Sequence, residues 1–239
     1  MTTTDPAAPT RTPGSAGPAR LAVLVAAVVL VAVSLDIFAT GPLTHLDHRL
    51  GRQLQSWDLR STDWPRYLLT VGIWFGQRGV VLTMAVLIAG VLSWRHRTLE
   101  PVVRLVVAVL ALLAVVYAFK LGLGRNAPIQ DARGEPAGSG SSYPSGHVAN
   151  AVLLWGLADW SLLRWPVSDR LSRAVHVGRW IAPFAITVAM TLLNYHWLSD
   201  FIGGAAVGVL LLALVLRPVW AAAAAPFDGR RRRSNAVVR

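Results

Sequence analysis

The sequence predicts an all-α protein, a bundle of six membrane-spanning helices with one interfacial amphipathic helix. The chain is 54% hydrophobic and only 15% charged, which is too apolar for an ordinary soluble domain. Apolar runs close to the roughly 20 residues that a helix needs to cross a bilayer recur along it. The arginines lie mostly between and beyond these runs, as expected of the loops that flank membrane spans.

The composition also excludes several classes of protein. Cysteine is absent, so a cysteine-based metal site is excluded. The net charge is +11, but no basic stripe interleaved with aromatic residues occurs, as nucleic-acid binding would need. We therefore interpret the charge as a signal of membrane topology and expect no nucleic-acid partner. Lys120 is the single lysine in a chain that otherwise uses arginine.

The N-terminal part predicts a tail followed by a membrane anchor. Residues 1–20 are rich in Thr, Pro, Ala and Gly, which predicts a disordered cytoplasmic tail. Residues 21–40 form the first expected span. Arg20 before a short apolar core also resembles a signal peptide, but Leu35, Ile37 and Phe38 extend the run towards full membrane length. An uncleaved anchor is therefore the preferred interpretation.

Residues 41–66 are of mixed polarity and predict the interfacial amphipathic helix, because their leucines have partly helical spacing. His45, Asp47 and His48 lie close together in this segment. Metal binding is one interpretation of this group. Solvated surface residues are the preferred one.

The second and third spans each contain a charge that needs an explanation. Residues 67–94 are apolar but interrupted by Gln77-Arg78-Gly79. A charge in mid-membrane is costly, so the span proper is expected at residues 80–94. The third span is expected at residues 101–123, where Arg104 near the start can extend its head group to the interface.

The remaining spans are expected at residues 146–163, 180–195 and 199–219, with a polar, basic loop at residues 164–179. Gly204 and Gly208 are four apart in the last span, a spacing that permits close helix contact. The membrane domain thus covers residues 21–219, and residues 220–239 form a basic cytoplasmic tail.

The distribution of arginine predicts how the chain is threaded through the cell membrane. With six spans, the basic segments fall on one side, which should be the cytosol. These segments are the N-terminal tail, residues 95–97, residues 164–179 and residues 230–233. Both termini are then cytoplasmic, and the loop at residues 124–144 and the junction at His196 are extracytoplasmic.

Three polar clusters meet at this outer face. The first runs from Lys120 to Pro128 and includes Arg125, the second is Pro144-Ser145-Gly146-His147, and the third runs from Asn194 to Asp200. Lys120 and Arg125 can neutralise phosphate oxygens. Backbone amides at the helix start near Ser145 and Gly146 form an anion site.

The two histidines and the aspartate add the chemistry of phosphoryl transfer. One histidine can attack phosphorus while the other protonates the leaving group. His196 and Asp200 are four apart and share a helix face, so the carboxylate can fix the imidazole tautomer. Separately, Lys120 could extend to the interface, His196 could be an interface residue, and Asp200 could cap a helix. Their conjunction favours a phosphate site.

At these residues the sequence resembles the type-2 phosphatidic acid phosphatase family of integral-membrane lipid phosphatases, over about residues 101–216. The family pattern is Lys, six residues, Arg-Pro; then Pro-Ser-Gly-His; then Ser-Arg, five residues, His, three residues, Asp. The middle part is complete at residues 144–147. Lys120 and Pro128 match the first part, and His196 and Asp200 match the last.

Two arginines of the family pattern are absent. Ala127 stands where the family has the arginine before proline, and Ala189-Met190 stand where it has Ser-Arg. Arg125 is the candidate to replace the first arginine. Asn194 and Arg133 are candidates to replace the second.

The resemblance implies a membrane phosphatase that uses neither metal nor cofactor. His196 would form the phosphohistidine, Asp200 would orient it, and His147 would be the acid. Lys120, Arg125, Ser145 and Gly146 would bind phosphate. The implied substrates are lipid phosphates at the outer leaflet, such as polyprenyl (pyro)phosphates, phosphatidic acid or phosphatidylglycerol phosphate. A phosphotransferase of the same fold and a catalytically weakened lipid-binding or scaffold member are the alternatives.

Overall fold

The computed structural model describes residues 17–129 and 140–218, and every regular element in these ranges is helical. This confirms the predicted all-α class. The elements are α1 (Gly17–Phe38), α2 (Pro42–Trp57), α3 (Asp63–Trp74), α4 (Arg78–His96), α5 (Glu100–Leu123), α6 (Gly146–Asn150), the π-helical segment η1 (Ala151–Trp155), α7 (Gly156–Arg164), α8 (Asp169–Leu192) and α9 (Leu198–Val215).

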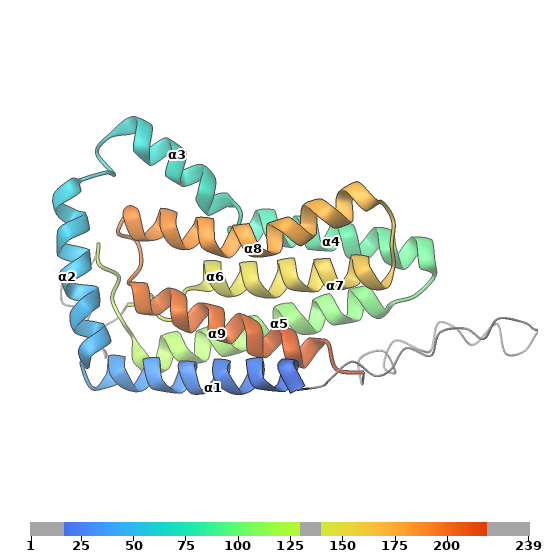
Figure 1. Ribbon diagram of the computed structural model, residues 1–239, viewed down its shortest axis with the longest axis horizontal. Helices are drawn as coiled ribbons and strands as arrows, with labels where there is room; N and C mark the ends of the chain where they lie inside the picture. Colours follow the sequence, from blue (N-terminus) through green and yellow to red (C-terminus); the bar gives the residue numbers. More distant parts are fainter. Residues whose placement is uncertain (1–16, 130–139, 219–239) are drawn as a thin grey trace, which may run out of the picture.

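The long helices run side by side, and α2 lies across one end of the bundle (Figure 1). Helix α1 packs along α9, α3 packs on α8, and α4 packs on α5. The connections that follow α1, α5 and α8 lie at the α2 end, whereas those that follow α4 and α7 lie at the opposite end (Figure 1). The polar clusters predicted to meet therefore do lie towards the same end of the bundle.

Five of the described helices are long and apolar enough to cross a membrane. They are Ala19–Phe38, Asp63–His96 (which joins α3 and α4), Glu100–Leu123, Asp169–Leu192 and Leu198–Val215. The predicted fourth span, at residues 146–163, is present as the consecutive segments α6, η1 and α7. Five long helices and one composite segment thus agree only approximately with the predicted count of six spans.

Both ends of the membrane domain differ slightly from the prediction. Helix α1 begins at Gly17, so residues 17–20 are helical and not part of a disordered tail. Helix α9 ends at Val215 rather than 219, because Pro218 disfavours helical backbone in the residue before it. The rest of the predicted N-terminal tail and the predicted tail at residues 220–239 lie outside the described residues.

The predicted loop at residues 164–179 is wrong, because α8 already begins at Asp169 and it ends at Leu192. Its polar half packs against α7 through the buried carboxylate of Asp159. Arg179 Nη1 lies 2.5 Å from Asp159 Oδ2, and His176 Nδ1 lies 3.1 Å from Oδ1. Because these charges are paired, the polar segment can form a packed helix. Hydropathy alone does not reveal the pairing and therefore predicted a loop.

Arg104 does not extend to the interface as predicted, since its side chain is only 2% exposed. Its guanidinium donates to Glu100 Oε1 at 2.6 and 2.9 Å and lies 4.6 Å from the Trp160 ring centroid. It also donates to the carbonyls of Val215 and Arg217. Val215 is the last residue of α9, where carbonyls lack partners within the helix, and Arg217 follows it. Arg104 therefore joins the start of α5 to the end of α9.

The close contact predicted for Gly204 and Gly208 is confirmed. A Cβ atom at Gly204 would lie 2.6 Å from the Ser145 carbonyl oxygen, and one at Gly208 would lie 2.6 Å from Val152 Cβ. Only glycine allows the backbones to approach this closely. The contact holds the start of α6, with His147, against the first half of α9.

We expect Gly204→Ala to lower the thermal unfolding midpoint in detergent micelles. The added methyl group meets backbone oxygen at 2.6 Å, and overpacking of this kind costs about 1–3 kcal/mol. Gly90→Ala is the matched control, because a Cβ there would meet nothing within 4 Å beyond its chain neighbours and the adjacent backbone of its own helix. Equal midpoints for the two variants would show that the α6–α9 contact is not tight.

Candidate active site

A cavity of about 440 Å³ lies where several helices meet. It is bounded by the start of α4, the end of α5, the start of α6 and the α8–α9 connection. Two basic side chains and two histidines line it, and no Asp or Glu is among its described lining residues. Such a cavity suits an anion. The lining consists of Gln77, Arg78, Gly79, Lys120, Ala127, Ser141, Ser142, Gly146, His147, Asn150, Tyr195 and His196.

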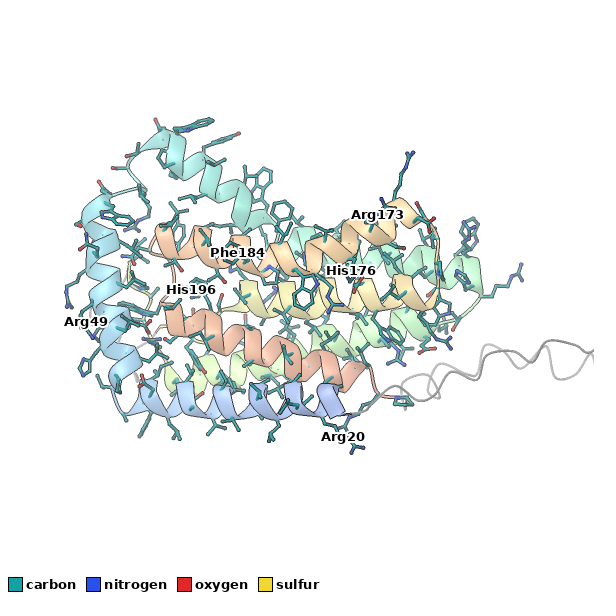
Figure 2. The ribbon with its side chains drawn as sticks, in the orientation of Figure 1. Arg20, Arg49, Arg173, His176, Phe184 and His196 are labelled. Carbon is teal, nitrogen blue, oxygen red and sulfur yellow. The ribbon has the colours of Figure 1, made fainter. Side chains whose placement is uncertain are left out.

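The structure brings the two predicted histidines to this one cavity. His147 is the second residue of α6, and His196 lies two residues before α9. Their ring centroids are 6.4 Å apart, with 69° between the ring planes. Figure 2 shows His196 in the part of the bundle near α2, whereas Arg20 and Arg173 lie at the opposite end.

His196 is oriented by Asp200, at the spacing that the sequence suggested. Its Nδ1 lies 3.1 Å from Asp200 Oδ2 and 3.1 Å from Ser142 Oγ. The Ser142 hydroxyl donates to the same carboxylate oxygen, so its single proton is already used. Nδ1 is therefore the protonated ring nitrogen, and Nε2 keeps its lone pair. Ser142 was not predicted.

Asp200 also closes the start of α9, and its side chain is fully buried. Its Oδ2 accepts the backbone N–H of Trp197 at 3.1 Å, and its Oδ1 accepts Arg125 Nη1 at 2.9 Å. Its carbonyl accepts the N–H of Ser145 at 2.9 Å. The two roles considered for Asp200, helix cap and histidine partner, are thus combined in one carboxylate.

Arg125 lies behind the cavity and is not among its lining residues. Its side chain is fully buried, with Nη2 2.8 Å from Asp47 Oδ2 and Nη1 2.9 Å from Asp200 Oδ1. Nη1 also donates to Ser199 Oγ at 2.6 Å. This geometry does not support the expectation that Arg125 binds phosphate. It indicates a residue that positions Asp200.

Asp47 is the second correction, because it was interpreted as a solvated surface residue and is only 1% exposed. It accepts the N–H of Ser199 at 3.1 Å and also the Ser199 hydroxyl. Helix α2 is thereby bound to the start of α9. Among the described residues, no group of three or more potential ligands is placed to hold a metal ion.

The expected anion site at Ser145 and Gly146 is present only in part. Gly146 lines the cavity, but Ser145 does not. The Ser145 N–H is used by the Asp200 carbonyl, and its Oγ has no hydrogen-bond partner among the described residues. Lys120, in the last turn of α5, lines the cavity as expected.

Two groups near the cavity have shifted pKa values. Burial raises the pKa of Tyr143 to about 12, so its hydroxyl stays protonated and bonds Ser34 Oγ at 2.9 Å. Burial lowers the pKa of His48, and the nearby Arg125 guanidinium lowers it further. Neutral forms of both groups limit the charge packed around the Arg125 guanidinium.

Comparison with known proteins identifies the family and the fold of the chain. The pattern of the PAP2 superfamily matches residues 101–223, more than half of the chain. The chain belongs to the PAP2 superfamily. The PAP2 fold is also found in the crystal structure of the first transmembrane PAP2 type phosphatidylglycerolphosphate phosphatase from Bacillus subtilis. That structure has a TM-score of 0.68 and 19% sequence identity, over 81% of this chain and 93% of the other. No curated protein is similar enough to match.

The two altered motif positions of this PAP2 protein have different surroundings. Ala127 lines the cavity, whereas Met190 packs in an apolar cluster with Val148 and Ile186. Asn194, one candidate for the second arginine, is buried and donates its amide to the Gly51 carbonyl at 3.2 Å. Arg133, the other candidate, lies outside the described residues.

We expect Arg125→Ala to destabilise this PAP2 protein strongly, since it leaves two buried carboxylates without a counter-charge. Loss of one partner of a buried ion pair costs about 3–5 kcal/mol. Asp47→Asn should have a smaller effect in the same direction, because Asp200 still pairs with Arg125. The measurement is the thermal midpoint in detergent, with Arg49→Ala on the exposed side of α2 as the control (Figure 2).

The opposite result would identify a phosphate ligand. If Arg125→Ala kept the wild-type midpoint but weakened binding of inorganic phosphate, the positioning role of Arg125 would be wrong.

Proposed function

We propose that this membrane protein is a lipid-phosphate phosphohydrolase that works through a phosphohistidine on His196. The geometry of the two histidines carries the proposal. The ring centroids of His196 and His147 are 6.4 Å apart at a cavity that Arg78 and Lys120 also line, and His196 is hydrogen-bonded to the buried Asp200 carboxylate. That separation leaves room for a phosphoryl group between the rings, with reacting atoms at roughly 3–3.5 Å.

In the first step, His196 Nε2 attacks phosphorus. The N–P bond forms and the bond from phosphorus to the lipid oxygen breaks, with its electron pair going to that oxygen. His147 in its protonated form donates a proton to the same oxygen, and the lipid alcohol leaves. Asp200 stabilises the positive charge that develops on the His196 ring, and its bonds to Arg125 and Trp197 keep it ionised and fixed.

In the second step, water attacks the phosphohistidine. Its proton passes to His147, the P–N bond breaks, and its electron pair returns to His196 Nε2. Inorganic phosphate is released, and both histidines regain their starting protonation states. Lys120 stabilises the negative charge of the phosphoryl oxygens in both steps. Amides of the first α6 turn at Gly146 and His147 add neutral donors.

An apolar groove supports a lipid substrate over a soluble phosphate ester. The groove has a volume of about 490 Å³ and begins at Val80, the residue after Gly79 of the catalytic cavity. It continues along one side of α4 towards α7 and α8. A hydrocarbon chain in this groove would place its phosphate at the cavity. The groove is lined by Val80, Thr83, Met84, Leu87, Ile88, Val91, Leu92, Leu162, Val167 and Leu171.

The distribution of charge supports an extracytoplasmic active site. The basic connection at residues 95–97 and the basic start of α8 lie at the end of the bundle away from α2 (Figure 1). Basic segments face the cytosol. The cavity near α2 then opens towards the opposite face of the membrane.

His196→Gln should reduce phosphate release by at least about 10³-fold, because a covalent nucleophile has no substitute. The assay uses purified protein in detergent with phosphatidic acid, phosphatidylglycerol phosphate and a polyprenyl pyrophosphate. Substrate carrying ³²P should label the wild type with an acid-labile, base-stable phosphate that is absent from the variant. His96→Gln at the exposed end of α4 is the control.

Two results would contradict the proposal. One is equal phosphate release by the wild type and His196→Gln. The other is the absence of phosphate release from every lipid in the panel, which would favour the binding or scaffold alternative.

A further inference from the structure

Arg78 lines the catalytic cavity although it is not part of any PAP2 motif in this chain. It is the first residue of α4 and shares the cavity with Lys120, His147 and His196. It also lies outside residues 101–223, the part of the chain that matches the superfamily. From the sequence we interpreted it as an unfavourable charge that interrupts a span.

The connection between α3 and α4, which leads to Arg78, is held against the α6–η1 segment that contains His147. Trp155 Nε1 donates to the Phe75 carbonyl at 3.0 Å. At Gly76, a Cβ atom would lie 2.9 Å from the His147 carbonyl oxygen and 2.3 Å from Ile186 Cδ1. The chain therefore touches the His147 backbone two residues before Arg78, and this contact fixes the start of α4 at the cavity.

The side chain of Arg78 is exposed and carries no ion pair within the described part of the chain. The two arginines that are buried among the described residues are different. Arg104 is paired with Glu100, and Arg125 is paired with Asp47 and Asp200. A guanidinium beside an apolar membrane groove needs an anionic or aqueous partner. The phosphate of a substrate would be such a partner.

Arg78 faces the same cavity as one of the altered motif positions. Ala127 lines that cavity, so an arginine there, as in the family pattern, would extend into the space that Arg78 now borders. Met190 offers no comparable site, because it is buried in an apolar cluster. At one of the two altered motif positions, that of Ala127, another arginine side chain therefore borders the same cavity. This side chain, Arg78, belongs to a different helix, α4.

We propose that Arg78 supplies, from the start of α4, the phosphate-binding guanidinium that the PAP2 motif normally supplies from the position of Ala127. This inference rests on the proposed function. Arg78 and Lys120 bind non-bridging oxygens of the substrate phosphate from two sides of the cavity, and the planar guanidinium can bind two of them at once. Substrate phosphate is held between these cations while His196 attacks.

The test compares full-length wild type, Arg78→Ala and Arg78→Lys in detergent. Each is assayed for hydrolysis of phosphatidic acid and for competitive inhibition by inorganic phosphate. Arg78→Ala should lower kcat/KM by about 10²–10³-fold, the usual effect of removing one preorganised donor. It should also raise the inhibition constant of phosphate at least tenfold. Arg78→Lys should fall in between, because it keeps the charge without the bidentate geometry.

Two further variants make the test specific. Arg95→Ala removes an exposed arginine from the other end of α4 and should behave as wild type. Arg78→Ala combined with Ala127→Arg restores a guanidinium to the motif position, and it should recover at least tenfold of the lost kcat/KM. A purely structural role of Arg78 would not be rescued from a different segment.

A readout without turnover separates this inference from the proposed function. Inorganic phosphate should raise the thermal midpoint of the wild type and of His196→Gln, but not that of Arg78→Ala. If no lipid phosphate is hydrolysed yet this pattern holds, the proposed function fails and the phosphate site at Arg78 stands. Equal inhibition constants and equal midpoint shifts for wild type and Arg78→Ala would overturn the inference. So would the lack of any phosphate-dependent shift in the wild type.

Discussion

The ion pairs of one buried arginine determine the geometry of the site. Arg125 lies between the carboxylates of Asp47 and Asp200, and all three side chains are fully enclosed. Two such carboxylates without a cation would repel each other, and one would be protonated. The pairing keeps Asp200 ionised and aligned on His196. It also joins three parts of the fold, because the residues come from α2, the segment after α5, and α9.

Close backbone packing between helices also positions residues of the site. Gly204 and Gly208 let α9 approach the α6–η1 segment, so His147 is held on the same cavity as His196. The π-helical segment places Trp155 where its indole binds the Phe75 carbonyl, which fixes the start of α4. Short π-helical segments within α-helices are frequent at functional sites. The cavity is therefore built by contacts between helices that are distant in sequence.

Much of this could be read from the sequence, and the misses share one cause. Apolar runs and motif spacing predicted the helical class, the meeting of the two histidines at one cavity and the pairing of His196 with Asp200. Asp47 was interpreted as a solvated residue, because local hydropathy does not reveal its distant partner Arg125. Arg78 was interpreted as a costly interruption of a span, because local hydropathy does not reveal that the start of α4 borders a polar cavity. Arg125 was expected to bind phosphate. Its two carboxylate partners were not recognised from the sequence, because they lie 75 and 78 positions away along the chain. Tertiary pairing of charges leaves no periodic signal along the chain.

The anchoring of α2 through Asp47 has a consequence for how far the molecule can be shortened. Every recognisable motif falls between Lys120 and Asp200, so residues 101–223 look like a self-sufficient unit. A fragment cut at that boundary would lose Asp47, and with it half of the charge that holds Arg125, as well as the helix start that carries Arg78. The recognisable family region is thus smaller than the smallest piece that can keep His196 and Asp200 aligned, because the segments that carry Asp47 and Arg78 lie before it.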